Sequence, residues 1–242
     1  MLMKQQLSKF LHFILKDKAI AVLSGPLKGW QWLPPSGNHS YWLGTYEREY
    51  VTTFSRYVQP GHVVFDIGAQ AGYFTLIASR LTGNEGQVVA FEPFPQNVRF
   101  IREHCRLNNC NNVKVLEVAV GGLSQTRQFL ANDSFMGHIS NKGSLEVETR
   151  ALDDLAAKHE ISLPNVLKID VEGMEYWVLQ GGKNIIQESR PTIFISTHGQ
   201  GNQSRVIQLL QEWSYETIKI GPGSAKNADY LAKPISGERA HL

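Results

Sequence analysis

The chain has 242 residues, of which 42% are hydrophobic, and this suits one α/β domain with short appendages. The formal net charge of +2 at pH 7 gives no reason to expect a nucleic-acid partner, because nucleic-acid-binding domains usually carry a basic stripe. Cys105 and Cys110 are the two cysteines. Both lie near the end of one predicted helix, which argues against a structural disulfide and favours a reducing, cytoplasmic compartment. No Cys/His cluster suggests zinc.

The first residues predict a basic amphipathic helix. Lysines alternate with apolar residues at helical spacing, namely Leu7, Phe10, Leu11, Ile14 and Leu15. The short apolar core and the lack of a clear cleavage site argue against a signal peptide. Such a helix could lie on a membrane surface, but we favour packing on its own domain or on a second subunit, which leaves a homo-oligomer open. We divide the chain into an N-terminal segment, 1–58, packed on a domain of residues 59–242.

The chain is organised around one strand–loop–helix–strand stretch. Val63 to Phe65 are β-branched or aromatic, as in a buried parallel strand, and Asp66 ends this run. A turn flanked by Gly68 and Gly72 follows, then a predicted helix and a second apolar run that ends at Glu92. In nucleotide-binding α/β units, an acid at the end of the second strand accepts hydrogen bonds from ribose hydroxyls.

Two ligands compete for this architecture. A dinucleotide requires the pattern G-x-G-x-x-G, so that its pyrophosphate can sit on the helix N-terminus. Here the spacing is Gly68-x-x-x-Gly72, and Asp66 would repel a pyrophosphate but suits a cationic sulfonium. The pattern therefore favours S-adenosylmethionine over NAD. The alternative is that Asp66 and Glu92 only end their strands and bind no ligand. One such acid at a strand end is commonplace, but two at consecutive strand ends are less expected by chance.

Helices and strands alternate along the rest of the chain, which indicates a mostly parallel sheet with helices on both faces. We expect helices at about residues 46–58, 95–108, 152–156, 177–181 and 206–213. We expect strands at 113–118, 166–171, 192–197, 215–220 and 229–232. A hairpin insertion is predicted near 126–150, and its polar tip, 132–142, is a candidate lid.

Residues 22–45 hold four aromatic side chains among glycines and prolines: Trp30, Trp32, Tyr41 and Trp42. Proline and glycine predict a loop or short strands here. The aromatic side chains could line an acceptor pocket and stack on a sugar, or they could close one end of the sheet. Aromatic residues dominate cores and interfaces alike, so both interpretations stay open.

Five motifs together resemble the FkbM family of S-adenosylmethionine-dependent methyltransferases. They are Tyr46-Glu47, Asp66-Ile-Gly-Ala-x-x-Gly72, Glu92-Pro93, Leu152-Asp153 and Lys168-Ile-Asp-Val-Glu-Gly-x-Glu175. The likeness runs from about Gly25 to His198, and the last motif is its most specific part. Two positions depart from the family pattern. Gln70 stands where Asn is usual, and Ser196 stands where an acid is common, so we assign Ser196 no role.

The resemblance implies a Rossmann-like class I methyltransferase fold, with a mostly parallel seven-stranded sheet whose last strand is antiparallel. It also implies O-methylation of a hydroxyl on a sugar, glycan or small natural product, with S-adenosyl-L-methionine as the cofactor. Two other functions stay open. One is an NAD(P)-dependent oxidoreductase on a similar sheet, and the other is a non-catalytic interaction module that has kept the fold.

Ligands of open α/β sheets bind outside the carboxyl ends of the strands, and this rule places the predicted site. We expect Asp66 and the glycine turn to hold the methionine part, Glu92 the ribose, and Ala119 and Val120 the adenine. The full cofactor set is Asp66, Gly68, Gln70, Gly72, Phe74, Thr75, Glu92, Pro93, Asn97, Ala119, Val120 and Asp170. The expected substrate-contacting residues are Tyr46, Glu47, Glu172 and Glu175.

A hydroxyl acceptor requires a group that removes its proton, and such a base typically adds about 10²–10⁴-fold to the rate. Asp170 and His198 are the candidate bases, and His198 has the unperturbed pKa better suited to neutral pH. The predicted catalytic residues are Asp170, His198 and Glu172. Asp170 and Glu172 could instead bind a divalent metal that lowers the pKa of the hydroxyl, but we assign no metal ligand.

Overall fold

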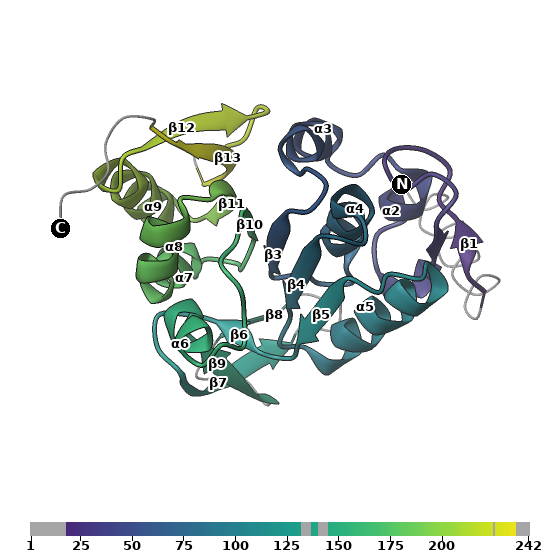
Figure 1. Ribbon diagram of the computed structural model, residues 1–242, viewed down its shortest axis with the longest axis horizontal. Coiled ribbons are helices and arrows are strands. Elements are labelled where there is room, and N and C mark those ends of the chain that lie inside the picture. Colours follow the sequence, from purple (N-terminus) through teal and green to yellow (C-terminus); the bar gives the residue numbers. More distant parts are fainter. Residues whose placement is uncertain (1–17, 132–136, 140–144, 225, 236–242) are drawn as a thin grey trace.

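The computed structural model describes residues 18–131, 137–139, 145–224 and 226–235. The predicted N-terminal helix and most of the predicted polar tip lie outside these residues. Within the described part, seven strands form one sheet in the order β12-β13-β11-β10-β3-β4-β5 (Figure 1). Their bounds are β3 Val63–Ile67, β4 Gln87–Phe91, β5 Val113–Leu116, β10 Val166–Ile169, β11 Thr192–His198, β12 Tyr215–Ile220 and β13 Asn227–Pro234.

The sheet has the predicted strand directions. The five strands from β11 to β5 are parallel to one another, and β13 runs antiparallel to both of its neighbours, β11 and β12. The expectation of a mostly parallel sheet with an antiparallel last strand is therefore confirmed. Parallel register brings the carboxyl ends of β3, β4, β10 and β11 to one edge.

The strands carry apolar side chains on both faces of the sheet, and helices cover both faces. Val64 packs with α3 (Arg48–Tyr57) and α4 (Tyr73–Thr82), and α5 (Pro95–Leu107) packs against Ala90 on the same side. Phe65 belongs to the opposite cluster. That cluster includes residues of α6 (Leu152–Ala157), α7 (Glu175–Gly181), α8 (Lys183–Ser189) and α9 (Gln200–Glu212). Each large, fully buried apolar side chain contributes roughly 1.5–3 kcal/mol.

One helix, α8, was not predicted. α7 ends at Gly181-Gly182 as the sequence predicts, and α8 begins directly after this pair at Lys183. A Cβ atom on Gly182 would lie 2.9 Å from Cδ1 of Leu152. This glycine therefore ends α7 and also permits close packing on α6.

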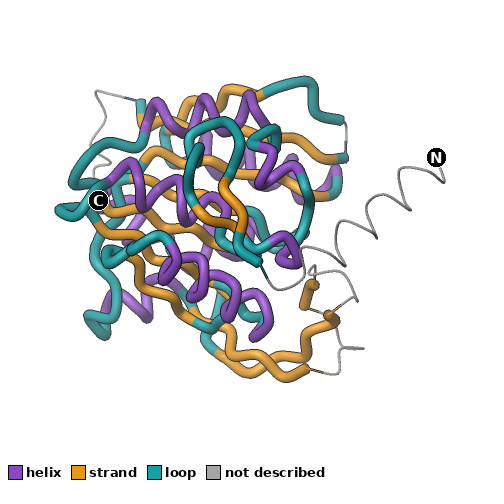
Figure 2. Tube along the Cα trace, turned by 90° about the vertical axis from the view of Figure 1, so that its right-hand side faces the viewer, coloured by secondary structure: helices purple, strands orange, loops and turns teal. Residues whose placement is uncertain are grey.

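The predicted hairpin insertion is present and is larger than expected. β7 (Gln125–Ala131) pairs antiparallel with β9 (Leu145–Arg150), and these long strands project at the lower right of Figure 2. β8 (Gly137–Ile139) pairs with β7 inside the segment that had been predicted as a polar tip, and β6 (Ala119–Val120) pairs with β9. The lid role of the tip stays a prediction.

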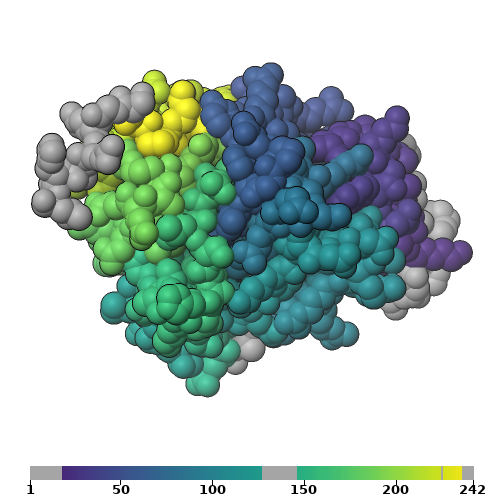
Figure 3. All heavy atoms as spheres, viewed as in Figure 1, coloured from purple at the N-terminus to yellow at the C-terminus, as the bar shows by residue number. Residues whose placement is uncertain are grey.

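The segment before α3 closes one side of the domain. It contains β1 (Ile20–Ala21), β2 (Gln31–Trp32), a 3-10 turn (Pro34–Ser36) and α2 (Ser40–Leu43). In the space-filling view this segment, in purple, lies directly against the teal residues of the domain (Figure 3). Trp32 is fully buried and stacks on His104 at 3.9 Å between ring centroids. Trp32 therefore belongs to the core, as one of the two interpretations of these aromatic residues expected.

Among the described residues, no helix combines the length and the apolar character needed to cross a lipid bilayer.

Candidate active site

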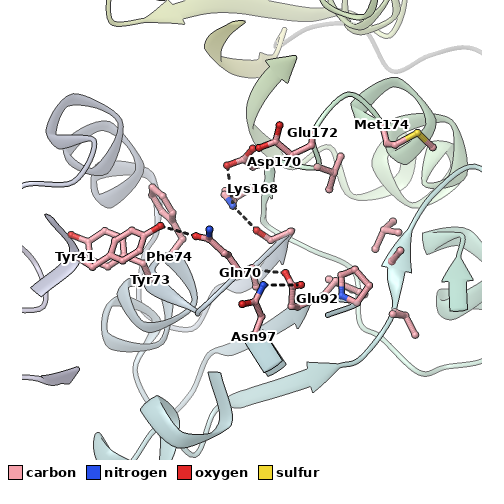
Figure 4. A pocket seen from close by; sticks show the side chains of 18 of the residues that line it. Tyr41, Gln70, Tyr73, Phe74, Glu92, Asn97, Lys168, Asp170, Glu172 and Met174 are labelled. Atoms are coloured by element: carbon pink, nitrogen blue, oxygen red, sulfur yellow. Dashed lines mark hydrogen bonds and ion pairs between the residues drawn. The ribbon is translucent and has the colours of Figure 1, made fainter. Parts of the chain in front are cut away.

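A cavity opens at the edge where the parallel strands end (Figure 4). Its lining comes from the loops after β3, β4 and β10 and from β6, together with aromatic residues of the N-terminal segment and α4. The lining residues are Tyr41, Tyr46, Gly68, Ala69, Gln70, Tyr73, Phe74, Phe91, Glu92, Pro93, Asn97, Val118, Ala119, Val120, Lys168, Asp170, Val171, Glu172 and Met174.

A buried ion pair lies under this cavity. Asp66 and Lys168 are direct neighbours in the register of β3 and β10, and Lys168 Nζ lies 3.3 Å from Asp66 Oδ1. Thr75 donates its hydroxyl to Asp66 Oδ2 at 2.6 Å. Burial alone would lower the pKa of Lys168, but the carboxylates of Asp66 and Asp170 outweigh this effect and raise it. Asp66 therefore neutralises a buried lysine and does not line the cavity.

The glycine turn is held against the end of β10. Gly68 has φ +78°, and a Cβ atom there would lie 1.9 Å from the carbonyl oxygen of Asp170. Lys168 Nζ donates to the carbonyl oxygen of Gly68 at 3.1 Å. The glycine is thus required by contact between two loops of the protein itself, whereas the sequence suggested close approach to a ligand.

Glu92 lies at the end of β4, where it lines the cavity and three donors hold its carboxylate. Oε2 accepts from the backbone N–H of Gln70 at 2.8 Å. Oε1 accepts from the backbone N–H of Phe94 at 3.0 Å and from Asn97 Nδ2 at 3.2 Å. Burial raises the pKa of Glu92 to about 7, although these hydrogen bonds oppose the shift. The carboxylate is therefore rigidly placed beside the cavity and titrates near neutral pH.

Aromatic side chains form the wall opposite the strand ends. Tyr41 donates its hydroxyl to Gln70 Oε1 at 2.6 Å, and its ring lies 4.5 Å from that of Tyr46 and 5.0 Å from that of Tyr73. Burial raises the pKa of Tyr41 to about 12, so its hydroxyl stays protonated. Tyr41 lines the cavity, in line with the interpretation that some of the N-terminal aromatic residues line a pocket.

Acids and a histidine gather at the ends of β10 and β11. His198 Nε2 lies 3.8 Å from Asp170 Oδ1 and 3.8 Å from Glu172 Oε2. His198 Nδ1 donates to Glu175 Oε1 at 2.8 Å. The hydrogen bond to Glu175 and the nearby carboxylates raise the pKa of His198 to about 9, against the effect of burial. The predicted catalytic residues, Asp170, Glu172 and His198, are thus brought together.

Glu175 does not face the cavity. Its side chain is fully buried, and besides His198 it accepts hydrogen bonds from the backbone N–H of Gly173 and from Asn202. Glu175 is also not among the lining residues of the cavity, so its carboxylate is not exposed to a substrate group there. The structure therefore gives Glu175 a positioning role toward His198 and not the substrate contact that we expected.

The predicted site residues divide into two groups. Those that line the cavity are Tyr46, Gly68, Gln70, Phe74, Glu92, Pro93, Asn97, Ala119, Val120, Asp170 and Glu172. Those that are not among its lining residues are Glu47, Asp66, Gly72, Thr75, Glu175 and His198. Glu47 is close to the site, since burial raises the pKa of its carboxyl and Asp170 adds to this effect.

Several lining residues were missed from the sequence. The most informative is Lys168, a charged residue within the apolar run of β10. A lysine in a buried strand signals a buried partner, because an unpaired internal charge is costly. Tyr73, the first residue of α4, and Met174, just before α7, carried no comparable signal, because aromatic and apolar residues in and beside helices are usually core residues.

Comparison with known proteins identifies the family. The family model described as the methyltransferase FkbM domain matches residues 66–217, a span that contains all four strand ends of the site. The chain belongs to this family. The FkbM resemblance is thereby confirmed, the protein is an S-adenosylmethionine-dependent methyltransferase, and the NAD(P) alternative is set aside.

Individual relatives of this FkbM-domain protein agree with the assignment. Hexuronic acid methyltransferase AglP of Haloferax volcanii is 27% identical over 175 residues, which cover 71% of this chain and 70% of AglP. The FkbM methyltransferase of Methylobacillus flagellatus has a TM-score of 0.52 at 15% identity. That match covers 81% of this chain and 55% of the other, so this chain spans about half the length of that protein.

A third solved structure supports the same fold. SMU.1697c of Streptococcus mutans, in complex with SAH (S-adenosylhomocysteine), has a TM-score of 0.51 at 12% identity. The match covers 75% of this chain and 93% of that one. These structural likenesses show that the FkbM-domain chain has the class I methyltransferase fold.

Proposed function

We propose that this protein transfers the methyl group of S-adenosylmethionine to a hydroxyl oxygen of a sugar residue. The observation that carries the proposal is the cluster of Asp170, Glu172 and His198, of which Asp170 and Glu172 line the cavity and His198 lies 3.8 Å from both. A hydroxyl acceptor needs a base to take its proton, whereas a carboxylate acceptor would need none. The sugar follows from AglP, which is named a hexuronic acid methyltransferase.

The cavity fits the cofactor in the chemistry of its lining. We assign the ribose hydroxyls to the Glu92 carboxylate and the adenine to the apolar surface of Val118, Ala119 and Val120, because all four residues line the cavity. The turn between Gly68 and Gln70 is left for the methionine part. When bound, the cofactor supplies a sulfonium methyl group that is already activated for transfer.

The protein's task is to align the acceptor and take its proton. The acceptor oxygen forms a bond to the methyl carbon as the bond between carbon and sulfur breaks, and the hydroxyl proton leaves to a base. Asp170 is the proposed base, because it lines the cavity and is held between Lys168 and His198. Alignment can contribute ~7–11 kcal/mol in favourable cases, and the base a further factor of about 10²–10⁴.

Isotope transfer tests this function. The full chain is incubated with methyl-labelled S-adenosylmethionine and a panel of neutral and uronic-acid oligosaccharides, and the product is treated with mild alkali. We expect label that resists alkali, as a methyl ether does. Asp170→Asn should lower turnover at least 100-fold while SAH affinity changes less than threefold. Label released by alkali would instead identify a methyl ester and exclude hydroxyl transfer.

The donor half of the proposal has a test of its own at Glu92. Replacing Glu92 with Ala removes the predicted hydrogen bonds to the ribose and should weaken SAH binding by roughly 1–3 kcal/mol. Because the pKa of Glu92 lies at about 7, SAH affinity of the wild type should rise between pH 6 and pH 8 as the carboxyl loses its proton. Titration calorimetry should show a flatter profile for Glu92→Gln. Equal profiles would contradict the role of Glu92.

A further inference from the structure

Three ligand-type atoms converge at the acceptor end of the cavity without bonding to one another. His198 Nε2 lies 3.8 Å from an oxygen of Asp170 and 3.8 Å from an oxygen of Glu172, and the three atoms lie within 4.8 Å of one another. These separations are too long for hydrogen bonds. Ligands that share a divalent cation at about 2.1 Å lie roughly 3.0–4.2 Å apart. The observed 3.8 Å separations fall within that range.

The histidine is oriented as a metal-ligating histidine would be. Its Nδ1 donates to the buried carboxylate of Glu175 at 2.8 Å, so the other ring nitrogen points toward the two carboxylates. Glu175 is in turn fixed by the backbone of Gly173 and by Asn202. A carboxylate that holds the far nitrogen of a ligating histidine is a recurring outer-shell feature of metal sites.

The charge around this point is one-sided. Glu47 and Asp229 are two further acidic groups close enough to Asp170 to interact with it electrostatically. The neighbouring cation, Lys168, is 3.3 Å from Asp66 and 3.8 Å from the second oxygen of Asp170. Lys168 is therefore shared with a closer carboxylate. The three carboxylates around His198, those of Asp170, Glu172 and Glu175, outnumber the single imidazole ring, so the cluster has an excess of acidic groups that a divalent cation would balance.

We propose that Asp170, Glu172 and His198 bind one divalent cation of the Mn²⁺ class. A set of two carboxylates and one imidazole suits Mn²⁺ and related ions, and three protein ligands leave coordination positions open. This step rests on the proposed function, and we assign the open positions to oxygen atoms of the acceptor. The cation would lower the pKa of the acceptor hydroxyl and would also bind the carboxylate of an adjacent uronic acid. The cation thus reconciles an acidic cluster with an acidic acceptor.

Calorimetric titration with Mn²⁺ tests the site without any acceptor. The full chain is treated with EDTA, dialysed and titrated with MnCl₂ in the presence and absence of SAH. We expect one Mn²⁺ per chain. Glu172→Gln and His198→Asn should each weaken Mn²⁺ binding at least tenfold while retaining SAH affinity, which also shows that the fold is kept.

Asp229→Asn is the matched control. It removes one negative charge near the cluster but none of the three proposed ligands, so Mn²⁺ affinity should change less than threefold. If Asp229→Asn and Glu172→Gln lost Mn²⁺ affinity equally, general electrostatic attraction would explain the binding, and the proposal would be overturned. Absence of Mn²⁺ binding in a wild type that binds SAH would overturn it too, but would leave the proposed function standing. Failure to bind SAH would instead count against the donor site.

Discussion

Three residues around the active site have a backbone conformation that side chains other than glycine disfavour. Glu47 has φ 39°, Gln70 φ 51° and Glu172 φ 50°. Such conformations cost of order 1–3 kcal/mol each and persist where surrounding contacts over-determine them. Here they place Tyr46 and Gln70 on the cavity wall and put the Glu172 carboxylate beside His198. Three of the seven described non-glycine residues with positive φ therefore lie where the chemistry is proposed.

Asp66 offers the clearest test at the scale of a single residue. Asp66→Asn leaves Lys168 buried with only the more distant carboxylate of Asp170, and we expect a loss of 3–5 kcal/mol in the free energy of unfolding. Urea denaturation measures this loss. Glu216→Gln is the control, because it removes the partner of the partly exposed Lys233 at 3.5 Å and should cost less than about 1 kcal/mol. Equal losses would show that Asp66 does not stabilise Lys168.

At the scale of elements, the contact between the β3 loop and the end of β10 builds the cofactor site. Gly68 and Gly61 have nearly the same φ, +78° and +80°, but a Cβ atom on Gly61 would meet nothing within 4 Å. Both alanine variants therefore share the backbone strain of about 1–2 kcal/mol. Only Gly68→Ala adds a clash with Asp170.

We expect Gly61→Ala to keep SAH affinity and Gly68→Ala to lose it and to be less stable by a further margin. Calorimetry with SAH and chemical denaturation measure the two effects. Similar behaviour of both variants would mean that the loop does not depend on its approach to β10.

His104 of α5 holds the N-terminal segment through hydrogen bonds that only its neutral ring can make. Its Nε2 accepts from the backbone N–H of Leu33 at 3.1 Å, and its Nδ1 donates to the carbonyl oxygen of Ala71 at 2.8 Å. This arrangement requires the neutral ring. Burial lowers the pKa of His104 to about 4, although the bond to Ala71 opposes the shift. A second proton would break the contact with Leu33.

Acid should therefore weaken this junction. The folded pKa lies below the unfolded value of about 6.5, so the stabilising contribution is present above pH 6.5 and is lost as the pH falls toward 4. The loss totals about 3 kcal/mol at the lower end. Denaturation between pH 8 and pH 4 should show a steeper decline for the wild type than for His104→Gln. Parallel curves would exclude His104 as the cause.

At the scale of the whole molecule, the N-terminal segment belongs to the core. Trp32, Tyr50 and Phe54 are buried in the same cluster as Val64 of β3 and Ile77 of α4. Residues 59–242 alone would expose that apolar surface. We expect this fragment to be poorly soluble and to lack a cooperative thermal transition by circular dichroism, whereas the full chain shows one. If residues 59–242 alone unfolded cooperatively with the same thermal midpoint as the full chain, the N-terminal segment would not be part of the core.

Much of the fold could be predicted because its signals are local. Apolar runs that end in an acid or a histidine, as at Asp66, Glu92, Asp170 and His198, predict buried strands of a parallel sheet. Parallel strands bring their ends to one edge, so the place of the site followed from the sequence. α8 was missed because a glycine pair that ends one helix gives no sign that another begins directly after it. β8 was missed because its three residues lie within a run predicted as a polar tip.

The sequence by itself determined which strands form and which chemical groups reach the edge of the sheet. Only the tertiary structure decided what each group does there. Asp66 turned out to pair with Lys168 because β3 and β10, about 100 residues apart, lie in register in the sheet. Glu175 turned out to hold His198 because α7 packs beside β11. Such pairings depend on long-range register and packing, which no local pattern of residues encodes.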